Sequence, residues 1–167
     1  MIKLLIVGIL LVQSLLIKAQ DIQPADLNYI VDKTTKESEK LMIKRGLKLA
    51  RNINVPNSNA KMVVFSYDIE GKQNLIIITE IPGTKNSVNY VFHDVDMYNW
   101  WLKTIKENKP FHFTPIIKTA DTNYDTYFIK SYAYLLGTHP NSPVGTAKYC
   151  VLAMQSEAFK KRFLDTK

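Results

Sequence analysis

The sequence has few of the residues that define several special classes of protein. Its 167 residues include one cysteine, six glycines and seven prolines. One cysteine excludes an internal disulfide, so the folded chain must be stabilised by its core alone. The low glycine and proline content excludes a collagen-like or low-complexity chain. With 46% hydrophobic and 22% charged residues, the composition also excludes a disordered or coiled-coil protein, and we expect one globular domain.

Long apolar runs are also missing, except at the N-terminus. Residues 4–17 form an apolar stretch that follows Lys3 and precedes Ala19, a small residue suited to a cleavage site. A membrane-spanning helix needs about 20 apolar residues, so this stretch is too short to be one. The sequence therefore predicts a cleaved signal peptide over residues 1–19 and a single domain over residues 20–167. We expect that domain to be exported to the periplasm or the extracellular space, with no membrane span left after cleavage.

Basic residues outnumber acidic ones. The chain has 22 Lys and Arg residues against 15 Asp and Glu residues, a formal net charge of +7, and removal of Lys3 and Lys18 with the signal peptide would lower the excess to five. A moderate basic excess favours anionic partners in a salt-dependent way. The partner expected for an exported protein is an anionic envelope component or another protein. We expect no nucleic-acid ligand and no cofactor.

The hydrophobic periodicity predicts an α+β fold. A long N-terminal helix over residues 24–51, a central helix over 94–108 and a short C-terminal helix over 156–164 are expected to pack on a largely antiparallel sheet of five or six strands. The predicted strands cover residues 61–67, 74–81, 88–92, 111–118, 124–136 and 149–154. Short links between strands favour antiparallel pairing.

Three residues or segments make this fold prediction more specific. The run Leu75 to Ile78 is apolar on both sides of its strand, so we expect cover on both faces of the sheet there. Pro115 belongs on an edge strand or at a bulge, because proline cannot donate a ladder hydrogen bond. The alternation around Cys150 places its thiol on an apolar face, which predicts a buried cysteine.

A basic ridge is predicted along the long N-terminal helix. At about 100° per residue, cations spaced three and four residues apart share one face of a helix. Closely spaced cations attract polyanions, which makes the ridge a candidate docking surface. The ridge could equally be a solvated helix face, with Glu37 pairing with its neighbours. The interaction residues predicted on the ridge are Lys36, Lys40, Lys44, Lys48 and Arg51.

The adjacent pair Trp100 and Trp101 lies on the predicted central helix. Trp101 follows the i, i+3, i+4, i+7 spacing of the buried stripe that Tyr98, Leu102 and Ile105 complete. Trp100 is then directed away from that stripe. An exposed tryptophan marks an interface, so Trp100 is the single residue that we most expect to contact a partner. Cover on both sides of the helix would instead bury both indoles.

Histidine and aspartate gather in sequence around the start of the central helix. His93, Asp94, Asp96 and His112 could hold a divalent metal or form an acid and base pair, as in a metal-dependent hydrolase. Their spacing matches no metal motif. The structural interpretation is that Asp94 caps the helix and Asp96 lies in its first turn, where the helix dipole favours an acid.

The sequence shows no motif for nucleophilic catalysis and no glycine loop for phosphate. It therefore favours an exported α+β domain that acts by binding or interaction rather than by catalysis. One alternative is the metal-dependent hydrolase described above. Another is an exported sensor or carrier whose pocket is lined by tyrosines of the 124–136 segment. These tyrosines are Tyr124, Tyr127, Tyr132 and Tyr134.

Overall fold

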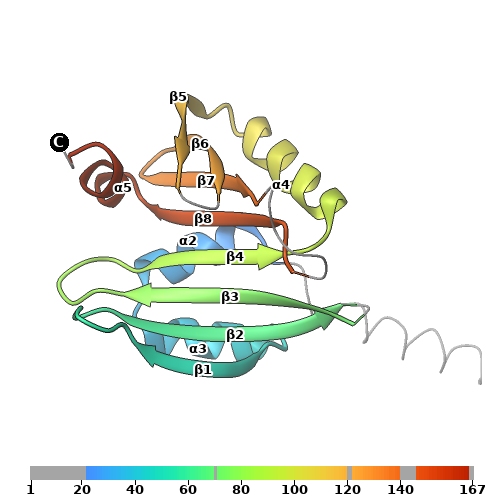
Figure 1. The fold of residues 1–167 in the computed structure, drawn as a ribbon, viewed down its shortest axis with the longest axis vertical. Coiled ribbons are helices and arrows are strands. Elements are labelled where there is room, and N and C mark those ends of the chain that lie inside the picture. The colour runs from blue at the N-terminus through green and yellow to red at the C-terminus, as the bar shows by residue number, and fades with distance from the viewer. Residues whose placement is uncertain (1–21, 70, 120–121, 140–145, 166–167) are drawn as a thin grey trace, which may run out of the picture.

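The computed structural model describes residues 22–69, 71–119, 122–139 and 146–165 (Figure 1). The predicted signal peptide lies outside these residues. Within them, four helices and eight strands follow one another along the chain. The helices are α2 (Pro24–Asp32), α3 (Thr35–Lys44), α4 (Val95–Glu107) and α5 (Ser156–Phe163). The strands are β1 (Lys48–Asn54), β2 (Lys61–Ile69), β3 (Lys72–Glu80), β4 (Ser87–Phe92), β5 (Phe111–Lys118), β6 (Asn123–Ile129), β7 (Tyr132–Thr138) and β8 (Tyr149–Gln155).

All eight strands form one antiparallel sheet in the order β1-β2-β3-β4-β8-β7-β6-β5. Strands β1–β4 and strands β5–β8 are each linked in succession, and the two sets join where β4 pairs with β8. The prediction of five or six strands with a long N-terminal helix is therefore wrong. The protein is mostly sheet, and its helices are short.

The predicted long helix is divided at Lys33 and Thr34. Thr34 begins α3 through a capping box, in which its hydroxyl accepts from the backbone N–H of Glu37 and its own N–H bonds the Glu37 carboxylate. The end of α2 is held by the β3–β4 hairpin, because the Asn86 side chain donates to the carbonyls of Ile30 and Lys33 at 3.1 and 2.8 Å. These contacts satisfy carbonyls that a helix end leaves without partners.

The last four residues of the predicted helix, 48–51, belong to strand β1. Gly46 ends α3 with a φ of 83°, a left-handed conformation that glycine adopts without a steric penalty. The chain then reverses and pairs with β2, so Arg51 lies opposite Val64. Helical periodicity in the sequence was misleading here, because β1 is an edge strand without a buried residue, and its structure is determined by pairing with β2.

The predicted strand over residues 124–136 is two strands. β6 and β7 are joined by a tight turn at Lys130 and Ser131, and Lys130 has a φ of 55°. Turns of this kind usually carry glycine or asparagine, which is why the lysine gave no turn signal. The register across the turn pairs Ile129 with Tyr132.

The central and C-terminal helices form where the sequence predicts them. Asp94 caps α4 by accepting a hydrogen bond from the backbone N–H of Met97 at 2.9 Å, which confirms its predicted role. Trp101 and Ile105 are fully buried along the predicted stripe. Pro115 lies in β5, an edge strand whose register with β6 shifts between Phe113 and Ile117. This position agrees with the prediction, because proline has no backbone N–H to donate to a neighbouring strand.

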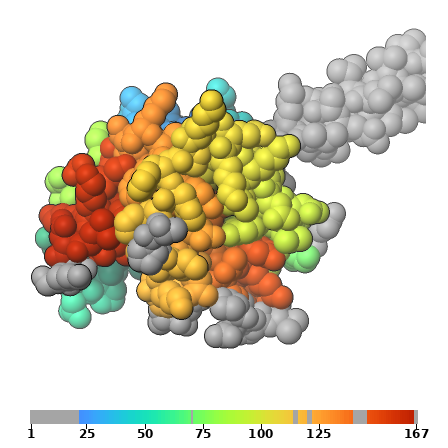
Figure 2. Space-filling model, turned by 90° about the horizontal axis from the view of Figure 1, so that it is seen from above, coloured from blue at the N-terminus to red at the C-terminus, as the bar shows by residue number. Residues whose placement is uncertain are grey.

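The helices cover the two faces of the sheet unequally. Helices α2, α3 and α4 pack on one face, and their apolar residues form a larger core with residues such as Phe65, Ile76 and Tyr90. The ribbon shows α2 and α3 behind strands β1–β4 (Figure 1). Helix α5 packs on the opposite face against β7 and β8, where Phe159 is the centre of a smaller core. Seen from the β5 end, α4 in yellow and α5 in red occupy different sides of the molecule (Figure 2).

Part of the second face has no such cover. The partly exposed residues Leu75 and Ile77 of β3 alternate with the fully buried Ile76 and Ile78. Leu75 and Ile77 belong to neither core, so cover on both sides of this strand is not found among the described residues. None of the four described helices has the length and apolar composition that crossing a membrane requires.

Candidate functional site

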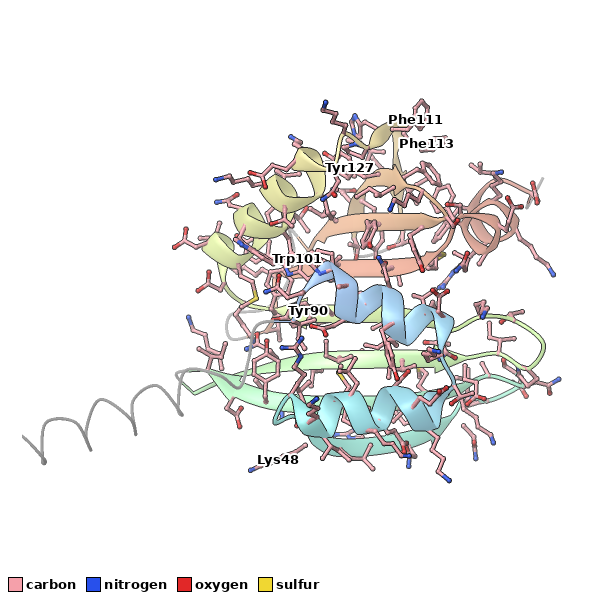
Figure 3. The ribbon with its side chains drawn as sticks, turned by 180° about the vertical axis from the view of Figure 1, so that it is seen from behind. Lys48, Tyr90, Trp101, Phe111, Phe113 and Tyr127 are labelled. Carbon is pink, nitrogen blue, oxygen red and sulfur yellow. The ribbon has the colours of Figure 1, made fainter. Side chains whose placement is uncertain are left out.

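The structure separates the predicted basic ridge into two parts. Lys36, Lys40 and Lys44 are exposed on α3, whereas Lys48 and Arg51 lie on the edge strand β1. Lys48 lies at the β1 edge of the molecule (Figure 3). One continuous ridge of these five cations on a single helix therefore does not exist, because the helix ends at Lys44 and the chain continues as a strand.

The outer side of α3 carries an exposed aliphatic residue among its lysines. Ile43 follows Lys40 by three residues and Lys36 by seven, so it projects from the same side of the helix. Its exposed fraction is 62%, while Met42, its neighbour in the chain, is fully buried. We call Lys36, Lys40, Ile43 and Lys44 the lysine face.

Two acidic residues flank the lysine face without neutralising it. Glu37 is bound to Thr34 in the capping box, and these hydrogen bonds lower the pKa of its carboxyl group. Glu39 is half-buried. The Glu37 carboxylate also interacts with the charge of Lys40, and the three lysines exceed the two acids by one positive charge.

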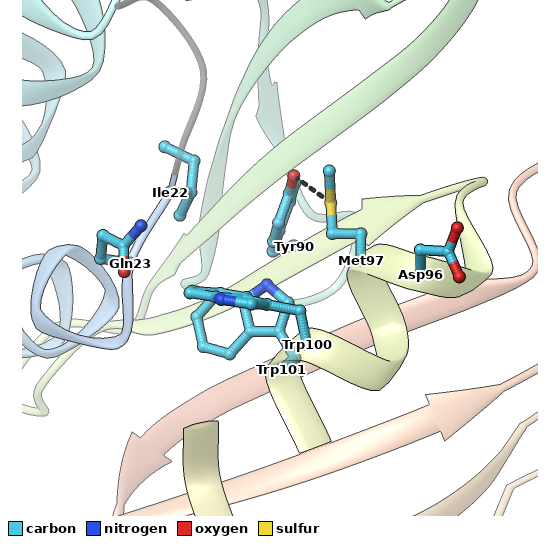
Figure 4. Close-up of a pocket in the computed structure, with 7 residues that line it drawn as sticks. All are labelled: Ile22, Gln23, Tyr90, Asp96, Met97, Trp100 and Trp101. Atoms are coloured by element: carbon cyan, nitrogen blue, oxygen red, sulfur yellow. Dashed lines mark hydrogen bonds between the residues drawn. The ribbon is translucent and has the colours of Figure 1, made fainter. Parts of the chain in front are cut away.

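A cavity of about 380 Å³ lies between the start of α2 and the first turns of α4 (Figure 4). Its walls, as far as the described residues form them, carry aromatic rings, a thioether and one carboxylate, with no basic residue among them. Trp100 is 38% exposed, whereas Trp101 and Tyr90 are fully buried and form the floor. The lining residues are Ile22, Gln23, Tyr90, Asp96, Met97, Trp100 and Trp101.

The rings of this cavity are closely packed. The centroids of Trp100 and Trp101 are 5.4 Å apart with the ring planes at 84°, and Tyr90 meets Trp101 at 6.2 Å and 64°. The Tyr90 hydroxyl donates to the Met97 sulfur at 2.9 Å and also bonds the Tyr67 hydroxyl. The Trp101 Nε1–H is buried and has no hydrogen-bond partner among the described residues.

The predicted metal-binding residues serve local structure. His93 Nε2 lies 3.1 Å from the carbonyl of Gln73, and Asp94 caps α4. His112 stacks on Tyr127 with centroids 4.7 Å apart. Asp96 lines the aromatic cavity instead. The part of the chain that the structure describes contains no group of three or more His, Cys, Asp or Glu side chains placed to hold a metal.

The four predicted tyrosines do not share a pocket. Tyr127 and Tyr134 belong to the larger core, whereas Tyr124 belongs to the smaller core on the opposite face. The Tyr134 hydroxyl donates to Asn28 and that of Tyr132 to Asp32, both on α2. The hydrogen bond to Asp32 raises the pKa of Tyr132 to about 12, and burial raises that of Tyr134 to about 12. These hydroxyls join the sheet to α2.

Cys150 is buried, as its position in the strand predicts. Burial raises the pKa of its thiol to about 11, so the thiol is protonated at neutral pH and is a poor nucleophile. Its packing is tight, because Gly137 on the paired strand leaves no room for a larger residue. A Cβ atom at Gly137 would lie 2.5 Å from the Cys150 sulfur.

Comparison with protein-family models, curated proteins and solved structures finds no match for this chain. Any function must therefore be argued from its own residues.

Sequence reasoning identified Trp100 and the α3 lysines but missed two features of these surfaces. Ile43 is one of them, because its exposure depends on where α3 packs. Met97 lies one helical turn before Trp101 on α4, but Tyr90 comes from β4, and only the fold brings it beside them. No local signal could have joined these residues to Gln23.

Proposed function

We propose that the protein is exported and acts by binding, docking on an anionic lipid surface of the cell envelope through its lysine face. The observation that carries this proposal is Ile43, which is 62% exposed between three exposed lysines. Anionic headgroups attract lysines, and an aliphatic side chain on the same side can enter the acyl boundary.

The energetics distinguish a lipid surface from other anionic partners. Each lysine near an anionic membrane contributes about 1 kcal/mol, and this attraction weakens as salt screens it. Full burial of an isoleucine side chain contributes about 1.5–3 kcal/mol, and this term does not depend on salt. An anionic polysaccharide provides the electrostatic attraction for the lysines but no apolar layer in which the isoleucine side chain could be buried. Ile43 therefore favours lipid as the partner.

The direct test is binding of the protein to vesicles of phosphatidylglycerol and phosphatidylcholine, measured by co-sedimentation at several salt concentrations. Replacing Lys36, Lys40 and Lys44 by glutamine should weaken partitioning by about 100-fold, which corresponds to about 3 kcal/mol. The Ile43→Ser variant should weaken it by about tenfold, because only part of the side chain would enter the bilayer.

A second triple variant controls for net charge. Lys106, Lys118 and Lys130 are also exposed, but they lie on α4, on β5 and in the β6–β7 turn. Their replacement by glutamine changes the net charge equally and should leave vesicle binding nearly intact. Equal losses in the two triple variants would contradict docking through α3. If Ile43→Ser leaves vesicle binding unchanged and the protein also binds heparin, the partner would be a polysaccharide rather than a lipid.

Export has its own test, because the signal peptide lies outside the described residues. Mass spectrometry of the protein from an envelope or medium fraction should find Gln20 at the N-terminus. Detection of the intact residues 1–19 on a cytosolic product would contradict export and remove envelope lipids as the partner.

A further inference from the structure

The aromatic cavity beside Trp100 is distinct from the lysine face and differs from it in charge. None of the Lys and Arg residues that the structure describes lines this cavity. Among the described lining residues one is charged, Asp96, which is exposed and forms no ion pair with the residues that the structure describes. The described walls of the cavity therefore carry a negative formal charge.

The uncharged aromatic walls of the cavity favour a positively charged organic ligand, as the carboxylate of Asp96 does. The face of an indole attracts organic cations within about 6 Å of the ring centroid, and tryptophan does so most strongly. Trp100 offers a ring that is 38% exposed, and the thioether of Met97 adds polarisable surface beside it. Asp96 and Trp100 both line the cavity, and Met97 lies between them (Figure 4).

The floor of the cavity contains an unsatisfied donor. Trp101 is fully buried, and its Nε1–H has no hydrogen-bond partner among the described residues. Leaving a buried donor unpaired is unfavourable, and native proteins seldom do so without a functional reason. Because Trp101 has no exposed surface, a ligand that stays in the cavity does not contact this donor.

We propose that this cavity binds a small organic ammonium compound. The ammonium group lies near Asp96 and the Trp100 ring. The volume of about 380 Å³ lies within the range of about 300–1,000 Å³ that is usual for small-molecule sites. This proposal is independent of membrane docking through α3.

The chain has only two tryptophans, and both line the cavity, so indole signals report on this site alone. The probes are choline, its neutral isostere 3,3-dimethyl-1-butanol and the anion 3,3-dimethylbutanoate. Choline is expected to shift the two indole N–H resonances in ¹H–¹⁵N spectra and to change the tryptophan fluorescence. The alcohol should bind about fivefold more weakly and the anion more weakly still, given the size of exposed cation–π and ion-pair interactions.

Two variants locate the binding. Asp96→Asn should weaken choline binding by about fivefold, which is the effect of losing one exposed charge near the ligand. Glu107→Gln is the matched control, because this carboxylate is exposed on the last turn of the same helix and does not line the cavity. It should leave choline binding unchanged.

Three outcomes would overturn the proposal. Equal shifts with choline and the alcohol would show an apolar site without preference for cations. Equal weakening by Asp96→Asn and Glu107→Gln would show a general charge effect. Unchanged indole resonances at saturating concentrations of all three probes would show that the cavity takes none of them. Vesicle binding through the lysine face would stand in each case.

Discussion

The two faces of the eight-stranded sheet are covered to different extents. Helices α2, α3 and α4 share one face, whereas α5 covers only part of the other. Strand β3 shows the contrast within a single segment, since Ile76 and Ile78 are fully buried while Leu75 and Ile77 remain partly exposed. All four residues are apolar. The placement of the helices, rather than the residue type, therefore decides which side of the strand is buried.

The largest expected effect lies on the face that the three helices cover. Ile76→Ala removes a fully buried side chain from the larger core and should lower the free energy of unfolding by about 4 kcal/mol. Urea unfolding followed by circular dichroism would measure this loss. A loss below about 1 kcal/mol would mean that this face is not packed as described.

A smaller effect is expected on the part of the second face that α5 covers. Gly137→Ala would bring a Cβ atom to 2.5 Å from the Cys150 sulfur and 2.7 Å from Tyr124 Cε1. We expect a loss of about 2 kcal/mol, the usual scale for overpacking. The same unfolding measurement applies. Adding Cys150→Ala should restore part of the loss, because it removes the nearest atom, and a purely additive double variant would contradict the packing explanation.

The smallest effect is expected on the uncovered part of the second face. Ile77→Ala truncates a partly exposed side chain that belongs to neither core, and it should cost about 1 kcal/mol. Ile76 and Ile77 are adjacent residues of the same type. The difference between the stability losses of their alanine variants therefore measures how much the covering helices contribute. Equal losses in the two variants would show that something buries Ile77 in solution as well.

Much of the local structure could be predicted from the sequence. The strand at 88–92, the central helix with its Asp94 cap and the C-terminal helix all follow strong periodic patterns or capping residues. The buried positions of Trp101 and Cys150 follow in the same way. These features depend on neighbours within a few residues, and a single sequence contains that information.

The main errors arose where distant segments decide the structure. The break after α2 depends on Asn86, more than fifty residues away, and β1 becomes a strand because β2 pairs with it. The sequence did contain a capping box at Thr34 and Glu37 and a helix-ending glycine at Gly46. The apparent helical periodicity nevertheless favoured one continuous helix through both positions. The turn at Lys130 carried no local signal.

The features of the candidate sites are likewise determined partly by local sequence and partly by contacts between distant segments. The sequence by itself determined the basic excess, the three α3 lysines and an outward Trp100, because spacing of three and four residues fixes the side of a helix. Only the tertiary structure decided that Ile43 is exposed beside those lysines and that β4 completes a cavity beside Trp100 and Trp101. Exposure and cavities depend on which elements pack together, and that choice is made by contacts between segments far apart in the chain.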